Sequence, residues 1–129
     1  MNDLNKIANN PWEKICALVD LPHNAGVAAL LNQDTALEKQ IALFRRGDSN
    51  DVYAISNFDP FSQANVLARG ILCSISGELA IASPVLKQHF SLSTGQCFED
   101  EAVSAQTYAT KISEGQVFVQ IPSTAGQAL

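Results

Sequence analysis

The sequence predicts an all-β fold, an antiparallel sandwich or barrel, and three observations support this prediction. Turn signals recur about every eight to twelve residues through the interior of the chain. The runs between them are short and rich in Val, Ile, Tyr and Phe, the residue types that favour strands. No long amphipathic helix pattern separates these runs, as would be expected if strands alternated with helices.

Five segments carry the turn signals, because each gathers several of the residues Gly, Pro, Asn, Asp and Ser within a short distance. In chain order they are RRGDSND after Phe44, FDPFS after Asn57, SISGEL around Gly77, SLSTGQ before Cys97 and SEGQ before Val117. The segments that remain between them have the length of ordinary strands.

Residues 27–43 form the most ambiguous segment, because they are rich in good helix formers. Asp34 or Thr35 could cap a helix that runs toward Leu43. Helix propensity is easily overridden by tertiary context, and strand patterns lie on both sides. We therefore expect two strands joined by a loop near residues 33–39, with a partly helical segment as the alternative.

Two hairpins are predicted with more local support. Residues 41–45 and 52–56 read as strands joined by the turn between them. Residues 116–121 alternate, with Val117, Val119 and Ile121 on one face and polar or aromatic residues on the other. The pair Glu114-Gly115 before this strand suits a tight hairpin turn, since Gly adopts a positive φ readily.

The length of 129 residues fits one domain with a single core. Residues 1–10 and 122–129 are short, polar or small, and we expect flexible ends there, with the β domain at residues 11–121.

The charge pattern excludes several classes of partner. The formal net charge is −5, and the eight Lys and Arg residues are scattered, so no basic patch for nucleic acid is expected. The first residues lack the apolar stretch of a secretory signal. The apolar run at residues 71–86 is interrupted by Gly77 and Glu78 and is too short to span a bilayer. We expect a cytoplasmic protein that does not contact the membrane.

Three cysteines, Cys16, Cys73 and Cys97, lie far apart in the sequence. An odd number cannot all pair within the chain, and none belongs to a C-x-x-C or C-x-H unit. Reduced, partly buried thiols are the simplest interpretation.

The order of the segments resembles a Rieske-type [2Fe-2S] domain. The resemblance runs from WEKICALVDLP at residues 12–22 through IALFR and VYAISN to two loops and then FSLSTGQC at residues 90–97. In that family the first loop carries C-x-H and the second C-x-x-H, with two thiolates on one iron and two imidazoles on the other. In this chain the corresponding positions hold Asp59, Phe61, Ser83 and Leu86.

These replacements predict that no cluster assembles. Phe61 and Leu86 have no lone pair to donate, while Asp59 and Ser83 offer hard oxygen atoms that suit a soft iron–sulfide core poorly. The resemblance therefore implies a Rieske-like fold with two protruding loops and without its cluster.

One branch of this family is more similar still. The segments NFDPFSQANVLARG and ASPVLKQHFSLSTGQCFED resemble the small subunits of assimilatory NAD(P)H-dependent nitrite reductases over more than thirty residues. The resemblance implies an accessory, non-catalytic subunit whose partner is the large subunit. That large subunit is expected to carry FAD, sirohaem and an iron–sulfur cluster and to reduce nitrite to ammonia. The preference for NADH or NADPH stays open.

The resemblance also suggests a docking role for the loop tips. The candidate residues are the four ligand positions together with two neighbours, namely Asp59, Phe61, Ser83, Leu86, Lys87 and His89.

Each candidate has a structural alternative. Asp59 before Pro60 can cap a turn with its carboxylate. Phe61 and Leu86 either fill the space of the cluster or present apolar surface to a partner. His89 is either a hydrogen-bonded structural or interface residue or a metal ligand.

Two further interpretations stay open. Lys87, Arg69 and His89 are either solvated charges and a structural histidine or a site for an acidic patch or anion. A Rieske-related electron carrier with a metal bound by Asp59, His89 and Cys97 is the functional alternative to the accessory subunit.

Overall fold

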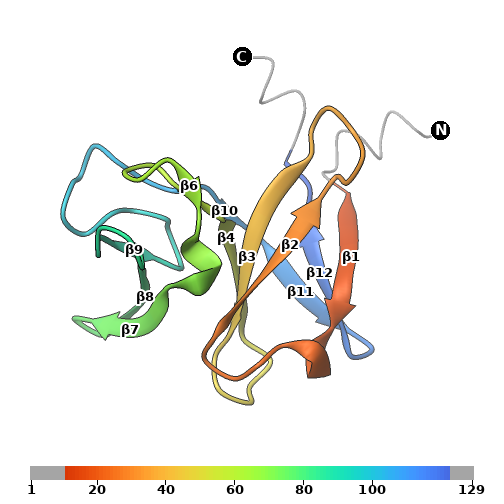
Figure 1. Ribbon diagram of the computed structural model, residues 1–129. Coiled ribbons are helices and arrows are strands. Elements are labelled where there is room, and N and C mark those ends of the chain that lie inside the picture. The colour runs from red at the N-terminus through yellow and green to blue at the C-terminus, as the bar shows by residue number, and fades with distance from the viewer. Residues whose placement is uncertain (1–10, 123–129) are drawn as a thin grey trace.

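Residues 11–122 are described from a computed structural model, and over this range the chain is built from antiparallel strands (Figure 1). The first sheet has the strand order β1-β12-β11, formed by Trp12–Ala17, Gln116–Gln120 and Thr110–Ser113. The second sheet has the order β10-β4-β3-β2, formed by Thr107–Tyr108, Val52–Ser56, Lys39–Arg45 and Gly26–Leu31. All pairings between these strands are antiparallel, as the sequence predicted.

A separate lobe carries the two loops. Its sheet has the order β7-β8-β9, formed by Ile71–Ile75, Glu78–Ala82 and His89–Ser91. A short hairpin of β5 (Phe58–Asp59) and β6 (Ala64–Asn65) lies in the same lobe (Figure 1). Two single-turn 3-10 helices, η1 (Leu18–Asp20) and η2 (Leu67–Arg69), complete the elements of the described range. None of the helices within residues 11–122 is long and apolar enough to cross a membrane.

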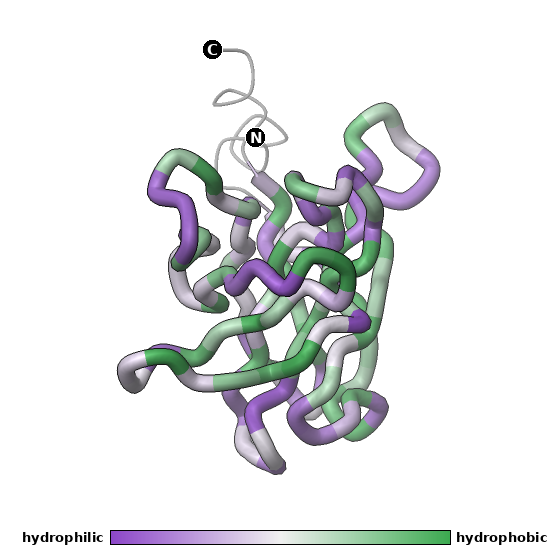
Figure 2. Tube along the Cα trace, turned by 60° about the vertical axis from the view of Figure 1, so that its left-hand side comes forward, coloured by the Kyte–Doolittle hydropathy of each residue, from purple (hydrophilic) through white to green (hydrophobic). Residues whose placement is uncertain are grey.

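Strand β3 lies at the centre of the molecule and is buried on both faces. Ile41 and Leu43 belong to a first core cluster, which fills the space between the first and second sheets. Ala42 and Phe44 belong to a second core cluster, which joins the second sheet to the lobe. The side chains of β3 are divided between the two clusters because successive side chains of a strand point to opposite faces. Figure 2 shows the apolar residues running along the strands and the polar ones gathered in the connecting turns.

The ambiguous segment forms two strands. Residues 27–43 contain most of β2 and β3, which pair from Gly26–Phe44 to Leu31–Lys39. Asn32 and Asp34 have positive φ angles and lie in the connecting turn, where no helix begins. The helical alternative was wrong because tertiary pairing overrides the local propensity of the segment.

Both predicted hairpins are confirmed. Strands β3 and β4 pair across the predicted turn, and β11 and β12 pair across Glu114 and Gly115, whose φ angles are +50° and +76°. In β12 the side chains of Val117 and Val119 are buried in the first core cluster, in agreement with the predicted alternation. The predicted flexible ends lie outside the described residues, apart from Pro122, so that prediction stays untested.

Candidate functional site

The first loop is fixed to the second sheet by Asn57, a buried residue that follows β4. Its Oδ1 accepts a hydrogen bond of 2.7 Å from the N–H of Ala68, and its Nδ2 donates one of 3.1 Å to Oε1 of Gln40. Because one amide side chain bonds Ala68 of η2 and Gln40 of β3, it ties these two elements together. The residues after Asn57 therefore leave the sheet in a defined direction.

Asp59 forms the turn that begins the tip of this loop. Its Oδ1 accepts hydrogen bonds from the N–H of Phe61 at 2.9 Å and from that of Ser62 at 3.4 Å. Its backbone carbonyl accepts a bond of 2.7 Å from the N–H of Gln63. The Asp side chain is short enough for its carboxylate to accept a hydrogen bond from the backbone N–H two residues ahead, which is why Asp is favoured in turns. The turn-capping alternative for Asp59 is thus confirmed.

The other carboxylate oxygen of Asp59 reaches the second loop. The hydroxyl of Ser83 donates to Oδ2 at 2.5 Å, and both side chains are buried, with 0% and 1% of their surface exposed. The distance is in the range of a charge-assisted hydrogen bond between a hydroxyl and a carboxylate. The two residues that we assigned to the cysteine ligand positions from the sequence resemblance are therefore joined directly to each other.

This environment favours the charged form of Asp59. Burial by itself raises the pKa of the carboxyl, because it removes the charge from water. The hydrogen bonds from Ser83 and from the backbone N–H groups of Phe61 and Ser62 outweigh burial, so the pKa lies below its ordinary value. At neutral pH the pair is a carboxylate that accepts from a hydroxyl.

Ser83 also organises its own loop. Its Oγ accepts a bond of 3.3 Å from the N–H of Val85, and its backbone N–H donates one of 2.8 Å to the carbonyl of Gln88. Lys87 closes this tight loop with a φ of +68°. The segment between Ser83 and Gln88 consequently projects from the end of β8 as a compact turn.

The two residues that we assigned to the histidine ligand positions, Phe61 and Leu86, differ from each other in their direction. Phe61 turns inward, where its ring lies 6.2 Å from that of Phe90, between centroids, and packs against the second core cluster. Leu86 points outward and is 51% exposed, and Lys87 beside it is exposed as well. Phe61 therefore fills interior space, whereas Leu86 presents an apolar side chain at the surface.

His89 is held by an acidic residue that we did not single out from the sequence. Its Nδ1 lies 2.6 Å from Oε2 of Glu99, and its backbone N–H donates to Oε1 at 2.8 Å. Burial raises the pKa of Glu99, but the hydrogen bonds from His89 and Cys97 outweigh this effect, so the pKa lies below its ordinary value. His89 is thus a hydrogen-bonded residue at the edge of the lobe, and its role in contacting a partner stays a prediction. No pattern in the sequence marked Glu99 as its partner.

The three cysteines are free thiols, as expected from the sequence. Burial raises the pKa of each, which disfavours the nucleophilic thiolate. Cys97 is fully buried, and its Sγ lies 3.5 Å from Oε1 of Glu99.

The residues at the four ligand positions do not fit a [2Fe-2S] cluster. Both oxygens of Asp59 are already occupied by hydrogen-bond donors, and Phe61 and Leu86 have no lone pair. Within residues 11–122, no three His, Cys, Asp or Glu side chains are grouped so that they could hold a metal ion. Asp59, His89 and Cys97, the ligand set of the electron-carrier alternative, are thus not assembled in that part of the chain.

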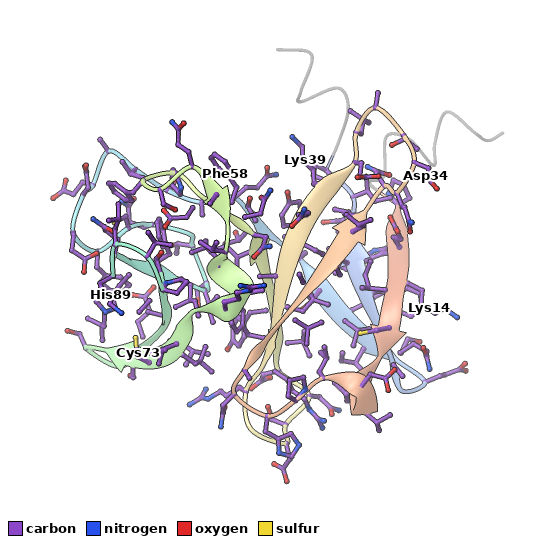
Figure 3. The ribbon with its side chains drawn as sticks, in the orientation of Figure 1. Lys14, Asp34, Lys39, Phe58, Cys73 and His89 are labelled. Carbon is purple, nitrogen blue, oxygen red and sulfur yellow. The ribbon has the colours of Figure 1, made fainter. Side chains whose placement is uncertain are left out.

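Two apolar residues that sequence reasoning missed also lie at the surface of the loops. Phe58 is 42% exposed and directly precedes Asp59, and Val85 is 49% exposed and precedes Leu86. Figure 3 shows Phe58 on the side of the lobe that faces Lys39. An open groove of about 400 Å³ lies there, lined by Glu38, Lys39, Gln40, Ser56, Phe58 and Asn65. The sequence pattern carried no signal for Phe58, because here the polar residues Asn57 and Asp59 are buried and the apolar residue between them is exposed.

The fold and the paired loops define a class of protein. A family model described as Rieske-like [2Fe-2S] domain matches residues 11–120, which is most of the chain. The ferredoxin of carbazole 1,9a-dioxygenase from Nocardioides aromaticivorans shares the fold with a TM-score of 0.68 at 22% identity, covering 86% of this chain and 98% of that one.

More similar relatives narrow the class. The nitrite reductase (NADH) small subunit of Escherichia coli K12 is 43% identical over 106 residues, which cover 82% of this chain and 94% of that protein. The solution structure of the E. coli protein NirD matches with a TM-score of 0.75 and 42% identity, over 84% of this chain and 94% of that one. This chain belongs to the nitrite reductase small-subunit family of Rieske-like domains.

A further relative is much longer. The nitrite reductase large subunit of Klebsiella oxytoca is 39% identical over 113 residues, which cover 88% of this chain but 11% of that protein. In that organism, a segment similar to this chain is thus part of a protein named as the large subunit.

Proposed function

We propose that this chain is the accessory small subunit of a NAD(P)H-dependent nitrite reductase, without a redox centre of its own. The observation that carries the proposal is the buried Asp59–Ser83 pair. It keeps the two loops together while occupying the positions that would supply thiolate ligands. An ordered loop tip that lacks metal-ligating side chains suits a role in protein binding better than a role in electron transfer.

The partner in this proposal is the large subunit. It would carry the FAD, the sirohaem and the iron–sulfur cluster and would reduce nitrite to ammonia in nitrate and nitrite assimilation. The large-subunit protein of Klebsiella oxytoca supports the pairing, because a segment similar to this chain lies within it. A cytoplasmic location is part of the same proposal, since reduced nicotinamide is a coenzyme of that compartment.

The loops supply the docking surface. Of the six candidate residues, Asp59 and Ser83 are buried and Phe61 packs inward, so these three would act by shaping the tip. Leu86 and Lys87 lie at its surface. We add Phe58 and Val85, whose exposed apolar side chains flank the buried pair along the chain. Exposed apolar patches rimmed by polar residues are typical of a protein contact.

The docking proposal predicts that surface substitutions in the loops weaken the complex. We expect Leu86→Ala and Lys87→Glu each to raise the Kd for the large subunit by about tenfold, the effect of losing about 1.4 kcal/mol at an interface. Val19→Ala is the matched control, because Val19 is 84% exposed but belongs to η1, outside the loops. Kd would be measured by titrating the purified large subunit. Unchanged binding in both loop variants would contradict docking through the tip.

The electron-carrier alternative is tested on the isolated chain. We expect freshly purified protein to be folded and colourless and to contain no stoichiometric iron or acid-labile sulfide. Visible absorption together with iron and sulfide analysis provides the measurement. Stoichiometric iron and sulfide with visible absorption bands would support the electron carrier instead.

A further inference from the structure

The Asp59–Ser83 pair crosses between two loops that are 24 residues apart in the sequence. Asp59 lies on β5 in the first loop, and Ser83 follows β8 at the start of the second. Apart from this pair, the side-chain hydrogen bonds of the first loop in the described part of the chain stay within that loop or reach the second sheet. The pair is therefore the side-chain hydrogen bond that joins the two tips in the described part of the chain.

Each member of the pair also fixes the backbone of its own loop. The Asp59 carboxylate accepts from the N–H groups of Phe61 and Ser62, and the Ser83 hydroxyl accepts from the N–H of Val85. One buried contact thus couples two turns. Because neither side chain is open to water, a broken contact would leave a buried carboxylate with an unmet acceptor, which is costly.

We infer that the Asp59–Ser83 hydrogen bond acts as a clamp that holds the two loop tips in a fixed relative position, in the place where other members of the fold class use a metal cluster. Asp59 and Ser83 are positioning residues in this inference. They order the exposed side chains of Phe58, Val85 and Leu86 and contact no partner themselves. The use of the ordered tip for docking rests on the proposed function, but the clamp itself is a property of the isolated chain.

Ser83→Ala removes the clamp, and the chain offers a closely matched control. Ser91 is equally buried, and its hydroxyl donates to a carboxylate, that of Glu78. Its Oγ accepts from two backbone N–H groups of its turn, where Ser83 Oγ accepts from one. Unlike the Ser83 side chain, the Ser91 side chain makes its hydrogen bonds in the described chain to Glu78, Ser93 and Thr94, all outside the first loop. Ser91→Ala therefore removes the same chemical group from the same lobe without unlinking the tips.

Amide hydrogen exchange followed by NMR separates local from global effects. We expect Ser83→Ala to raise exchange at the N–H groups of Phe61 and Ser62 about tenfold relative to the N–H of Val119 in β12, which reports global unfolding. Ser91→Ala should leave that ratio unchanged. Asp59→Asn, which keeps an oxygen for the turn, is a milder second variant if Ser83→Ala folds poorly. It should raise exchange at the N–H of Val85 in the opposite loop.

The inference is overturned if neither variant changes exchange in the opposite loop, or if Ser91→Ala loosens the first loop as much as Ser83→Ala. The affinity of the same variants for the large subunit tests the proposed function separately. A loosened first loop with unchanged affinity would leave the clamp standing and contradict docking through the tip.

Discussion

At the scale of single residues, four side chains decide what the loops can do. Asp59 and Ser83 are drawn together in the interior, Phe61 packs on Phe90, and Leu86 stays at the surface. Their chemistry follows from their donors and acceptors: a carboxylate and a hydroxyl satisfy each other, and an aromatic ring without polar atoms fills apolar space. The loops therefore keep their order by hydrogen bonding and packing.

The charge of Asp59 makes stability depend on pH. Its pKa is lower in the folded chain than the ordinary value of about 3.9. The ionised group thus contributes stability that is fully present above that value and is lost as the pH falls through the folded pKa. We expect Asp59→Asn to cost about 1–3 kcal/mol at neutral pH. The loss should shrink in acid, so the variant's stability should fall less steeply between about pH 5 and pH 2.

Urea unfolding at a series of pH values measures this effect. Asp51→Asn is the control, because Asp51 is exposed and its side chain makes no hydrogen bond in the described chain. It should keep the acid dependence of the unsubstituted protein. An unaltered pH slope in Asp59→Asn would show that Asp59 does not contribute in this way.

At the scale of elements, the turns set how closely the strands of the lobe approach. Gly95, in the turn after β9, has a φ of +82° and lies against Ala105, whose carbonyl oxygen would be 1.9 Å from an added Cβ. Gly77, in the β7–β8 turn, has nearly the same φ, +83°, but nothing within 4 Å of that position. The two turns therefore separate the cost of backbone strain from the cost of close packing.

Substitution of these glycines by alanine should give unequal losses. We expect Gly77→Ala to lower the free energy of unfolding by about 1 kcal/mol, the strain of a positive φ in a residue with a Cβ. Gly95→Ala adds a backbone clash and should cost at least about 3 kcal/mol or prevent folding. Thermal or urea unfolding of both variants gives the comparison. Equal losses would mean that the turn after β9 can shift to admit a side chain.

At the scale of the whole molecule, β3 unites the two core clusters. Leu43 lies in the first and Phe44 in the second, and both are fully buried. We expect Leu43→Ala to cost about 2–5 kcal/mol and Phe44→Ala about 3–5 kcal/mol. Because both clusters depend on one strand, each variant should still unfold in a single transition with an unchanged denaturant slope.

Urea unfolding followed separately by near-ultraviolet and far-ultraviolet circular dichroism tests this. Coincident curves are expected for both variants. Two separate transitions, with the lobe unfolding before the paired sheets, would show that the second cluster is not coupled to the first through β3.

Much of the fold could be predicted from the sequence, because the information is local. Turn residues such as Glu114 and Gly115 mark the ends of strands, and the alternation in β12 identifies its buried face. Residues 27–43 were harder, since their propensity favours a helix and only pairing of β2 with β3 resolves them. The assignment of Asp59, Phe61, Ser83 and Leu86 to the four ligand positions rests on the sequence resemblance and stays a prediction.

The contacts and directions of the four side chains at the assigned ligand positions were decided only by the tertiary structure. The sequence by itself determined that Asp59 could cap a turn and that Phe61 and Leu86 could not bind iron. It did not determine that Asp59 meets Ser83, that Phe61 turns inward or that Leu86 turns outward. Such contacts join segments that are distant in the chain, so they depend on how both loops pack on the same lobe. The space left by that packing selects each side chain's direction, and no local pattern encodes it.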